Sequence, residues 1–422
     1  MGVFTYSPVD FLLTCMGLVF LLLDIGLDTW AVVTFYQEKA YVGLSFLLLF
    51  LLGSSVLVQA FSWLWYSYKG SVRETTVEKC LSMRQLKVFH VLQLGIFIRH
   101  AGVVEISVRS FRTASDNVHE DVAVCLNHDL SLLRLIETFS ESAPQLVLML
   151  AIILQRGQLD PVTVLKALGS ASAIAISITM YHRAMRSFLP DKARQNMMSS
   201  AVYFLWNLLL IASRLVALSL FASMLPCFIV SHFFCSWVVL FFLVWQCKTD
   251  FMDSSCGEWL YRATVGLFLY FNWFNVVGGR TKCMSLFYHT LVLADIIFLC
   301  SLWCWNMINT EHPHFKVSLM SALITAVSVV GVYIIGLLFK IMYYHRFHPN
   351  DAKEKLKGSV KPDPTQTHAD VVDSAGSKDV LKGTFRIQAP DDQMDHRLFI
   401  PPEPHIQYYN KRMRRLAENF YS

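Results

Sequence analysis

Residues 41–66 read YVGLSFLLLFLLGSSVLVQAFSWLWY and contain no charged side chain. A helix needs about 20 predominantly apolar residues to cross the hydrocarbon core of a bilayer, so this stretch is long enough to span a membrane. Lipid offers no partner to backbone N–H and C=O groups, whereas a helix satisfies those groups internally. The stretch therefore predicts a transmembrane α-helix.

The rest of the chain has the same character. It has 422 residues, of which 55% are hydrophobic and only 16% charged, whereas about a quarter of the residues of a soluble domain are charged. We therefore predict an all-α polytopic membrane protein. The other long apolar segments lie at residues 9–36, 88–108, 125–155, 161–182, 199–224, 227–246, 258–277, 284–305 and 317–344.

Lysine and arginine residues gather in particular connections between these segments. Cytoplasmic loops of membrane proteins carry an excess of both residues, so the basic connections are expected inside the cell. The chain following residue 345 is also basic at its start, which predicts that both termini are cytoplasmic. The basic connections contain Lys69, Arg73 and Lys79, then Arg183, Arg186, Lys192 and Arg194, and then Lys248, Arg280 and Lys282.

The positions of the basic loops constrain how many segments cross. In each half of the chain an odd number of apolar segments separates two inside loops, so one segment must enter and leave on the same side. The most polar segments are 88–108 and 258–277, which predicts eight transmembrane helices plus two re-entrant helices in two pseudo-symmetric halves. Their polar residues are His90, Arg99, His100 and Glu105 in the first, and Glu258, Arg262, Asn272 and Asn275 in the second.

Charged residues also occur inside the predicted spans. A charge at mid-membrane costs about 2.5–3.5 kcal/mol on insertion scales, and such residues usually pair, face a cavity or mark a path for a polar substrate. Structural pairing between helices explains any one of them, but the whole set favours a hydrophilic path through the membrane. The residues are Asp24, Asp28, Arg134, Glu137, Glu141, Arg214 and Asp295.

Pro144 follows the charges of the fourth segment. Proline lacks an N–H group and interrupts the helical hydrogen bonds, so we expect a bend at this position. A moving hinge and a static kink are both compatible with the sequence.

Motifs for catalysis or metal binding are missing from the sequence. It contains no H-E-x-x-H, G-x-S-x-G, P-loop or G-x-G-x-x-G pattern, and the cysteines lack zinc-site spacing. We interpret Asn127, His128 and Asp129 as capping residues at the start of a segment rather than as an acid–base cluster. We therefore predict no enzymatic activity, cofactor, metal site or nucleic-acid binding.

The C-terminal part of the chain differs in composition from the spans. Residues 346–409 are rich in Asp, Lys, Pro, Gly and Ser, which predicts a disordered cytosolic tail that follows the membrane domain of residues 1–345. Residues 410–422 are predicted to form a short basic amphipathic helix. Its defining residues are Arg412, Met413, Leu416, Phe420 and Tyr421.

Several stretches of the chain resemble the XK-related protein family, and the pattern R-L-x-E-T-x-x-E-x-x-P-Q-L is specific. The resemblance extends over residues 10–350 and implies eight spanning helices with two re-entrant helices in two halves. The matching stretches are LLDIGLDTW (22–30), DLSLLRLIETFSESAPQL (129–146), YFLWNLLL (203–210), EWLYR (258–262), FNWFNV (271–276) and YYHRFHP (343–349).

The chain looks similar in particular to the caspase-activated phospholipid scramblases of this family. The resemblance implies ATP-independent, bidirectional movement of phospholipids that exposes phosphatidylserine on dying cells, at the plasma membrane. It also implies two kinds of protein partner, an effector caspase and a single-span immunoglobulin-type subunit such as basigin or neuroplastin.

The tail contains a sequence that fits such a caspase. Effector caspases cut after the second Asp of Asp-x-x-Asp and prefer a small next residue, which matches Asp370, Asp373 and Ser374. A solvated tail is also suited to proteolysis. A second match ends at Asp395 and is followed by His396, a poorer neighbour.

We hypothesise that the terminal amphipathic helix holds the closed state and that cleavage releases it. Two other classes of function remain open from the residues alone. The buried charges are also compatible with a solute or ion transporter, and the chain as a whole is compatible with a non-transporting membrane scaffold subunit.

Overall fold

The computed structural model describes residues 8–67, 73, 75–112, 117–157, 161–187, 195–247, 249–252, 254–275, 281–309 and 318–347. Within these ranges the chain is largely helical and has no β-strand. The elements are α1 (Pro8–Gln37), α2 (Tyr41–Ser67), α3 (Thr76–Lys79), α4 (Met83–Val91), α5 (Gly95–Arg112), α6 (Asn117–Glu137), the π-helical turn η1 (Thr138–Ser142), α7 (Ala143–Arg156), α8 (Pro161–Ser187), α9 (Met197–Met224), α10 (Pro226–Gln246), α11 (Ser255–Phe271), α12 (Thr281–Asn309), α13 (Leu319–Met342) and the π-helical turn η2 (Tyr343–Phe347).

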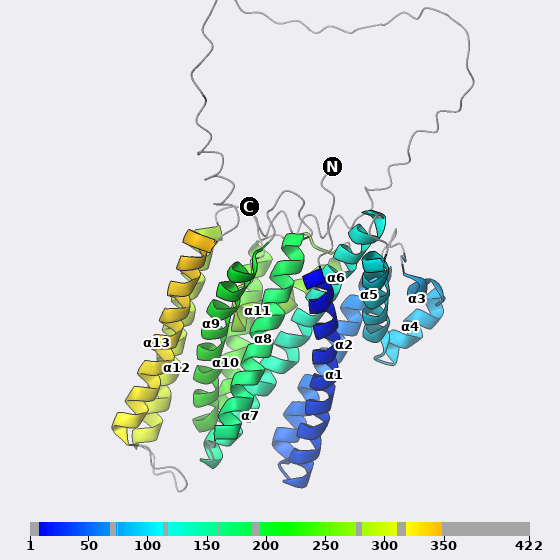
Figure 1. The fold of residues 1–422 in the computed structure, drawn as a ribbon. Coiled ribbons are helices and arrows are strands. Elements are labelled where there is room, and N and C mark those ends of the chain that lie inside the picture. The colour runs from blue at the N-terminus through cyan, green and yellow to red at the C-terminus, as the bar shows by residue number, and fades with distance from the viewer. Residues whose placement is uncertain are drawn as a thin grey trace, which may run out of the picture.

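Eight stretches of the described chain are long and apolar enough to cross a membrane. They are α1, α2, the continuous stretch from α6 through η1 to α7, α8, α9, α10, α12, and α13 with η2. These helices lie side by side in one bundle, and α1 begins at the same end of the bundle where α13 finishes (Figure 1). The prediction of an all-α polytopic membrane protein is confirmed.

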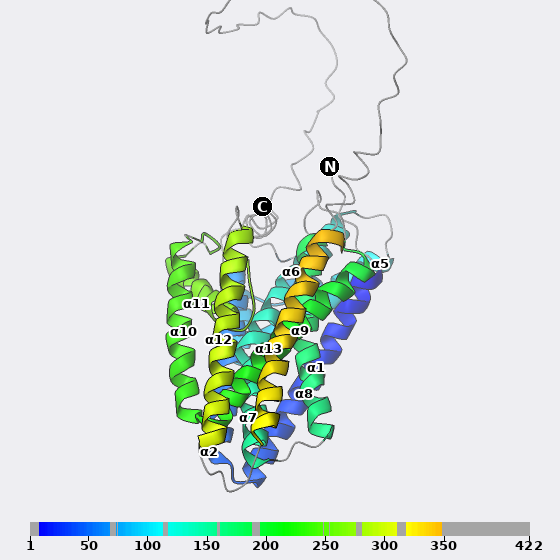
Figure 2. The same ribbon diagram turned by 90° about the vertical axis from the view of Figure 1, so that its left-hand side faces the viewer.

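Two shorter helices, α5 and α11, occupy only the upper half of the bundle in both views (Figures 1 and 2). The chain descends through α3 and α4, turns at Gln93, whose φ is 64°, and returns upward as α5. In the other half, α11 descends and gives way to extended backbone at Asn272, where φ is −149° and ψ is 156°. Each half of the chain thus has the predicted order of hairpin, partial helix and hairpin.

Helix α9 forms the centre of the bundle. Its buried residues lie all around its circumference, as expected for a helix that other helices enclose. It packs against α7, α8, α12 and α13. The approach of α13 is close at Gly336, where an added Cβ would lie 2.9 Å from Leu210 Cδ2. Glycine at this position therefore leaves room for the Leu210 side chain of α9.

The structure corrects the boundaries of two predicted segments. The segment expected at 88–108 consists of two helices, α4 and α5, because the chain reverses at residues 92–94. The segment expected to begin at 125 begins at Asn117, since α6 extends upstream through a polar stretch that an apolar window misses. The capping interpretation of His128 and Asp129 was wrong, because both are buried in the middle of α6.

The irregularity expected at Pro144 is present as a π-helical turn, η1, immediately before α7. Pro144 cannot donate to the carbonyl of Ser140. Single-turn π-helical segments inside α-helices are rare and are frequently found at functional sites. The turn contains Glu141, whose carboxylate faces Asp24 and Asp28 of α1, and it packs against α2.

Candidate functional site

Three carboxylates from two separate spans come together in the first half of the bundle. Asp24 and Asp28 lie on α1, and their carboxylate oxygens lie within 4.8 Å of one another and of an oxygen of Glu141 in η1. Gln145 donates a hydrogen bond from Nε2 to Asp28 Oδ1 at 2.9 Å. The spacing of four residues placed the two aspartates on one helix face, and the fold places Glu141 opposite them.

Arg134 supplies positive charge to this acidic group. It lies in α6 close enough to Glu137 and Asp24 to interact electrostatically with both. Its guanidinium also lies against α1 at Gly17, where an added Cβ would come within 2.7 Å of Nη1. Five of the seven predicted charges therefore form one cluster, called here the first-half cluster: Asp24, Asp28, Arg134, Glu137 and Glu141.

The two remaining charges form a second cluster between α9, α10, α11 and α12. Arg214 Nη1 and Asp295 Oδ2 form an ion pair at 2.5 Å, and Arg214 Nε donates to the carbonyl of Tyr270 at 3.2 Å. His232 bridges the group, with Nε2 at 3.1 Å from Asp295 Oδ1 and Nδ1 at 3.0 Å from the hydroxyl of Tyr270. These four residues are called the second-half cluster.

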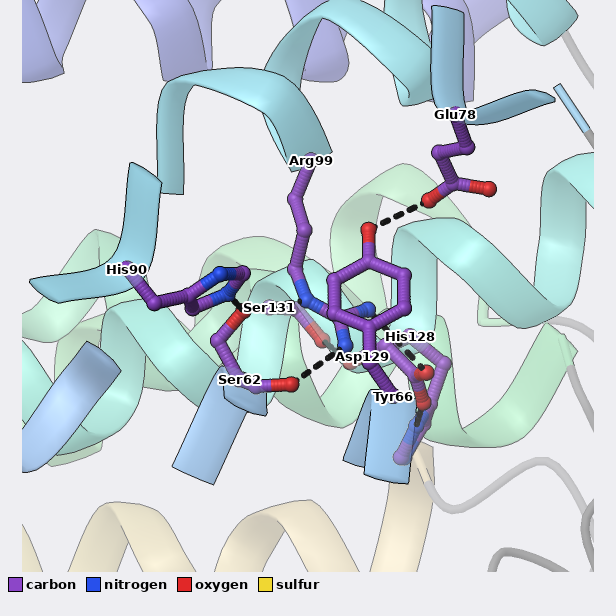
Figure 3. A network of polar contacts seen from close by, with 8 residues as sticks. All are labelled: Ser62, Tyr66, Glu78, His90, Arg99, His128, Asp129 and Ser131. Atoms are coloured by element: carbon purple, nitrogen blue, oxygen red, sulfur yellow. Dashed lines mark hydrogen bonds and ion pairs between the residues drawn. The ribbon is translucent and has the colours of Figure 1, made fainter. Parts of the chain in front are cut away.

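A third network, which sequence reasoning did not assemble, surrounds Arg99 of α5 (Figure 3). Arg99 donates from Nε to Ser62 Oγ at 2.7 Å and from Nη2 to the Ser62 carbonyl at 2.9 Å. Its Nη1 lies 3.9 Å from Asp129 Oδ2, and its guanidinium carbon lies 4.0 Å from the centre of the Tyr66 ring. Arg99 therefore ties the re-entrant helix to α2 and α6.

The outer part of the Arg99 network secures the short helices. The hydroxyl of Tyr66 donates to Glu78 of α3 at 2.5 Å, and His90 Nε2 lies 2.8 Å from Ser62 Oγ (Figure 3). Only the polarity of the segment around Arg99 signalled this network in the sequence. Its partners on α2 and α6 depend on contacts between segments distant in the chain.

The second half repeats the central part of this arrangement. Arg262 of α11 donates from Nε to the hydroxyl of Thr249 at 2.9 Å and from Nη2 to the Thr249 carbonyl at 2.8 Å. Ser62 and Thr249 both lie near the end of the second helix of their half, and each receives the same pair of bonds from the partial helix. This correspondence supports the predicted pseudo-symmetry at the level of atoms.

The bundle contains a cavity of about 700 Å³, and none of the seven charged residues of the two clusters lines it. Its walls come from α2, η1, α7, α9, α10 and α11 and are mainly apolar. Ser140, which adjoins Glu141, and Tyr270, which belongs to the second-half cluster, both line it. One end is rimmed by Lys39 and Arg156. The sequence did not predict this cavity.

Seven of the predicted site residues lie outside the described residues. They are Asp370, Asp373, Ser374, Arg412, Met413, Leu416 and Phe420. The structure therefore places the intramembrane charges but not the cleavage site or the terminal helix.

The chain is similar to known proteins over most of its length. The XK-related protein family matches residues 12–349. XK-related protein 8 of Tetraodon nigroviridis is 39% identical over 92% of this chain and 97% of its own length. The proteins of the same name from Gasterosteus aculeatus and Pan troglodytes are 40% and 33% identical, covering 82% and 98% of this chain and 85% and 94% of their own lengths. The match spans the helices that carry all three polar networks, and the chain therefore belongs to the XK-related protein family.

Proposed function

We propose that this protein is a phospholipid scramblase that moves lipids between leaflets in both directions without ATP. The single observation that carries the proposal is an apolar cavity, lined by Ser140 and Tyr270, in a bundle that also contains two clusters of intramembrane charges. A phospholipid combines a charged headgroup with apolar chains, so a transport path must offer polar groups to the first and apolar surface to the second. Membership of the XK-related family supports this assignment.

In this proposal the intramembrane charges carry the headgroup. Carboxylates of the first-half cluster attract the amine of the headgroup, while Arg134 and Arg214 attract its phosphate. The acyl chains remain in lipid or in the apolar cavity. The charges lower the energetic cost of bringing a polar group through the hydrocarbon core.

We further propose that an effector caspase activates the protein by cutting after Asp373. The cut removes 422 − 373 = 49 residues, including the predicted terminal helix with Arg412, Met413, Leu416 and Phe420. While it is tethered, that helix stays near the membrane domain at an effective concentration in the ~mM range. After cleavage the terminal helix dissociates and no longer stabilises the closed state.

This function requires the plasma membrane and a cytoplasmic position for both termini. The shared end at which α1 begins and α13 finishes is compatible with that orientation (Figure 1), and the basic connections favour the cytoplasm for it. An effector caspase then reaches the tail. We also propose that the protein binds a single-span immunoglobulin-type subunit, basigin or neuroplastin.

Expression in cells that lack their own scramblases tests this proposal. Cells carry the wild type or Asp373→Ala, effector caspases are triggered, and annexin binding and protein size are recorded together. We expect wild-type protein to shorten and phosphatidylserine to be exposed, and the variant to do neither. Cleavage of the wild type without lipid exposure would contradict the proposal and favour a solute transporter or a scaffold.

A further inference from the structure

Lys340 of α13 forms a polar group with α12, separate from the clusters of the proposed path. Its Nζ lies 2.7 Å from Ser285 Oγ and 2.7 Å from His289 Nε2. His289 is buried, and its Nδ1 lies 2.9 Å from the hydroxyl of Tyr333. Lys340 and Ser285 are only partly buried, so the group is accessible from outside the bundle.

The hydrogen-bond roles leave two donors of this group unused. An ammonium has three N–H donors and no acceptor, so His289 must accept at Nε2 and carry its own proton on Nδ1. Ser285 and His289 occupy two of the three ammonium donors. Because Ser285 accepts from the lysine, its hydroxyl hydrogen is also available. One N–H of Lys340 and one O–H of Ser285 thus remain for a ligand with acceptor oxygens.

No carboxylate of the described residues pairs with Lys340. The buried arginines Arg99 and Arg214, by contrast, each have an aspartate partner. The adjacent connection, residues 276–280, reads VVGGR and contains no acidic residue. Charges removed from water are normally paired. We therefore expect an anion from outside the described chain to pair with the Lys340 ammonium. The ring of Trp273, with its centre 6.0 Å from Nζ, is a weak substitute.

The group lies near the end of the bundle at which α12 begins and α13 finishes (Figure 1). Ser285 is one turn from the start of α12 at Thr281, or about 6 Å along the helix. Lys340 lies two residues before the end of α13 at Met342, and the same span continues through η2 to Phe347. In the proposed orientation this end faces the cytoplasm, whose leaflet is rich in anionic lipids. The flanking surface is apolar and exposed, with Leu286, Phe287, Leu338 and Ile341.

We propose that Lys340 and Ser285 bind the phosphate of an anionic phospholipid in the cytoplasmic leaflet, with His289 and Tyr333 fixing the lysine in place. The phosphate oxygens accept from the ammonium and the hydroxyl, and the acyl chains lie along the exposed apolar surface of α12 and α13. This site holds a lipid at the margin of the bundle and is separate from the apolar cavity, which none of its residues lines. It stands whether or not the protein scrambles lipids.

Thermal unfolding of the purified full-length protein in detergent tests the site. The probes are dioctanoyl phosphatidylserine, dioctanoyl phosphatidylcholine and inorganic phosphate. We expect phosphatidylserine to raise the melting temperature of the wild type more than phosphatidylcholine does. In Lys340→Met the apparent affinity falls about tenfold, the effect of one charge-assisted hydrogen bond. The matched control Lys282→Met removes an exposed lysine at the same end of α12 and retains the response.

The measurement with inorganic phosphate distinguishes a phospholipid ligand from free phosphate. Stabilisation by phosphatidylserine alone assigns the site to a lipid. If inorganic phosphate stabilises the wild type equally and fails on Lys340→Met, the site binds phosphate but the lipid assignment is overturned. An equal phosphatidylserine response in wild type and Lys340→Met overturns the site itself.

A second measurement on the wild type does not depend on folding of the variant. An amine-reactive ester labels accessible lysines, and mass spectrometry reports the rate at Lys340. Phosphatidylserine should slow labelling of Lys340 but leave Lys282 unchanged. Identical labelling rates at Lys340 with and without the lipid would overturn the proposal.

Discussion

Arg214 and Asp295 form an ion pair at 2.5 Å that joins α9 to α12 inside the membrane bundle. The Arg214 side chain is 4% exposed and the Asp295 side chain is 27% exposed. Because Arg214 lies on the most enclosed helix, its charge depends on this partner. Asp295 also contacts His232, which in turn contacts the hydroxyl of Tyr270, a residue that lines the apolar cavity.

Removal of one member of this pair should destabilise the protein. Asp295→Asn leaves the Arg214 charge without a full counter-charge, and the free energy of unfolding should fall by about 3 kcal/mol. The double variant Arg214→Met/Asp295→Leu should recover part of that loss, since no buried charge remains. Denaturant unfolding in detergent measures both. A single variant as stable as the wild type would show that the pair contributes little.

Neutralisation of the first-half cluster should slow lipid transfer. In Asp28→Asn/Glu141→Gln the headgroup loses charge-assisted contacts, and the transfer rate should fall by about tenfold or more. Glu38→Gln changes an acid in an exposed ion pair with Arg156 and is the matched control. Fluorescent-lipid transfer in liposomes measures the rates. If the double variant is folded and transfers lipid at the wild-type rate, these residues are structural.

Glu105 should contribute to the stability of α3 in a manner that depends on pH. Burial raises the pKa of Glu105, but hydrogen bonds from Thr76 and Val77 and the charge of Arg109 outweigh it and hold the pKa below its ordinary value of 4.5. A carboxylate with a lowered folded-state pKa stabilises the fold above the unfolded-state pKa, and that contribution disappears as the pH falls through the folded-state pKa.

Glu105→Gln should therefore weaken the start of α3 at neutral pH by about 0.5 kcal/mol, a small value because the carboxylate is partly solvated. Amide hydrogen exchange at Thr76 and Val77 should be faster in the variant at pH 7. The two proteins should converge once the wild-type carboxylate is protonated. A difference that persisted unchanged in acid would exclude the charge as its cause.

The predicted terminal helix should act as an inhibitor. Leu416→Asp/Phe420→Asp places charges on its apolar face and should give annexin binding in cells without caspase activity. Asn410→Asp adds one negative charge, against two in that variant, outside that face and should leave the protein silent. A silent Leu416→Asp/Phe420→Asp protein at normal surface abundance would contradict the autoinhibitory role.

The sequence predicted those features that depend on local patterns, namely apolar length, loop charge and residue spacing. Apolar length predicted the spans, and loop charge predicted that α5 and α11 do not cross. The four-residue spacing of Asp24 and Asp28 predicted their common face. The pairing of Arg99 with Asp129 was missed because it joins two helices that are distant in the sequence. His128 and Asp129 were interpreted as capping residues because polar residues before an apolar span resemble a helix cap. The cavity was missed because its apolar lining looks the same in sequence as a lipid-facing surface.

Lipid transfer by purified protein in liposomes is the most direct test of the scramblase function. The liposomes carry a fluorescent phosphatidylserine in both leaflets, and a membrane-impermeant quencher is added outside before and after treatment with an effector caspase. We predict that the cut wild type exposes nearly all of the fluorescent lipid to the quencher, while uncut protein and cut Asp28→Asn/Glu141→Gln leave the inner leaflet protected. Complete cleavage of a folded protein with the inner leaflet still protected would contradict the scramblase function.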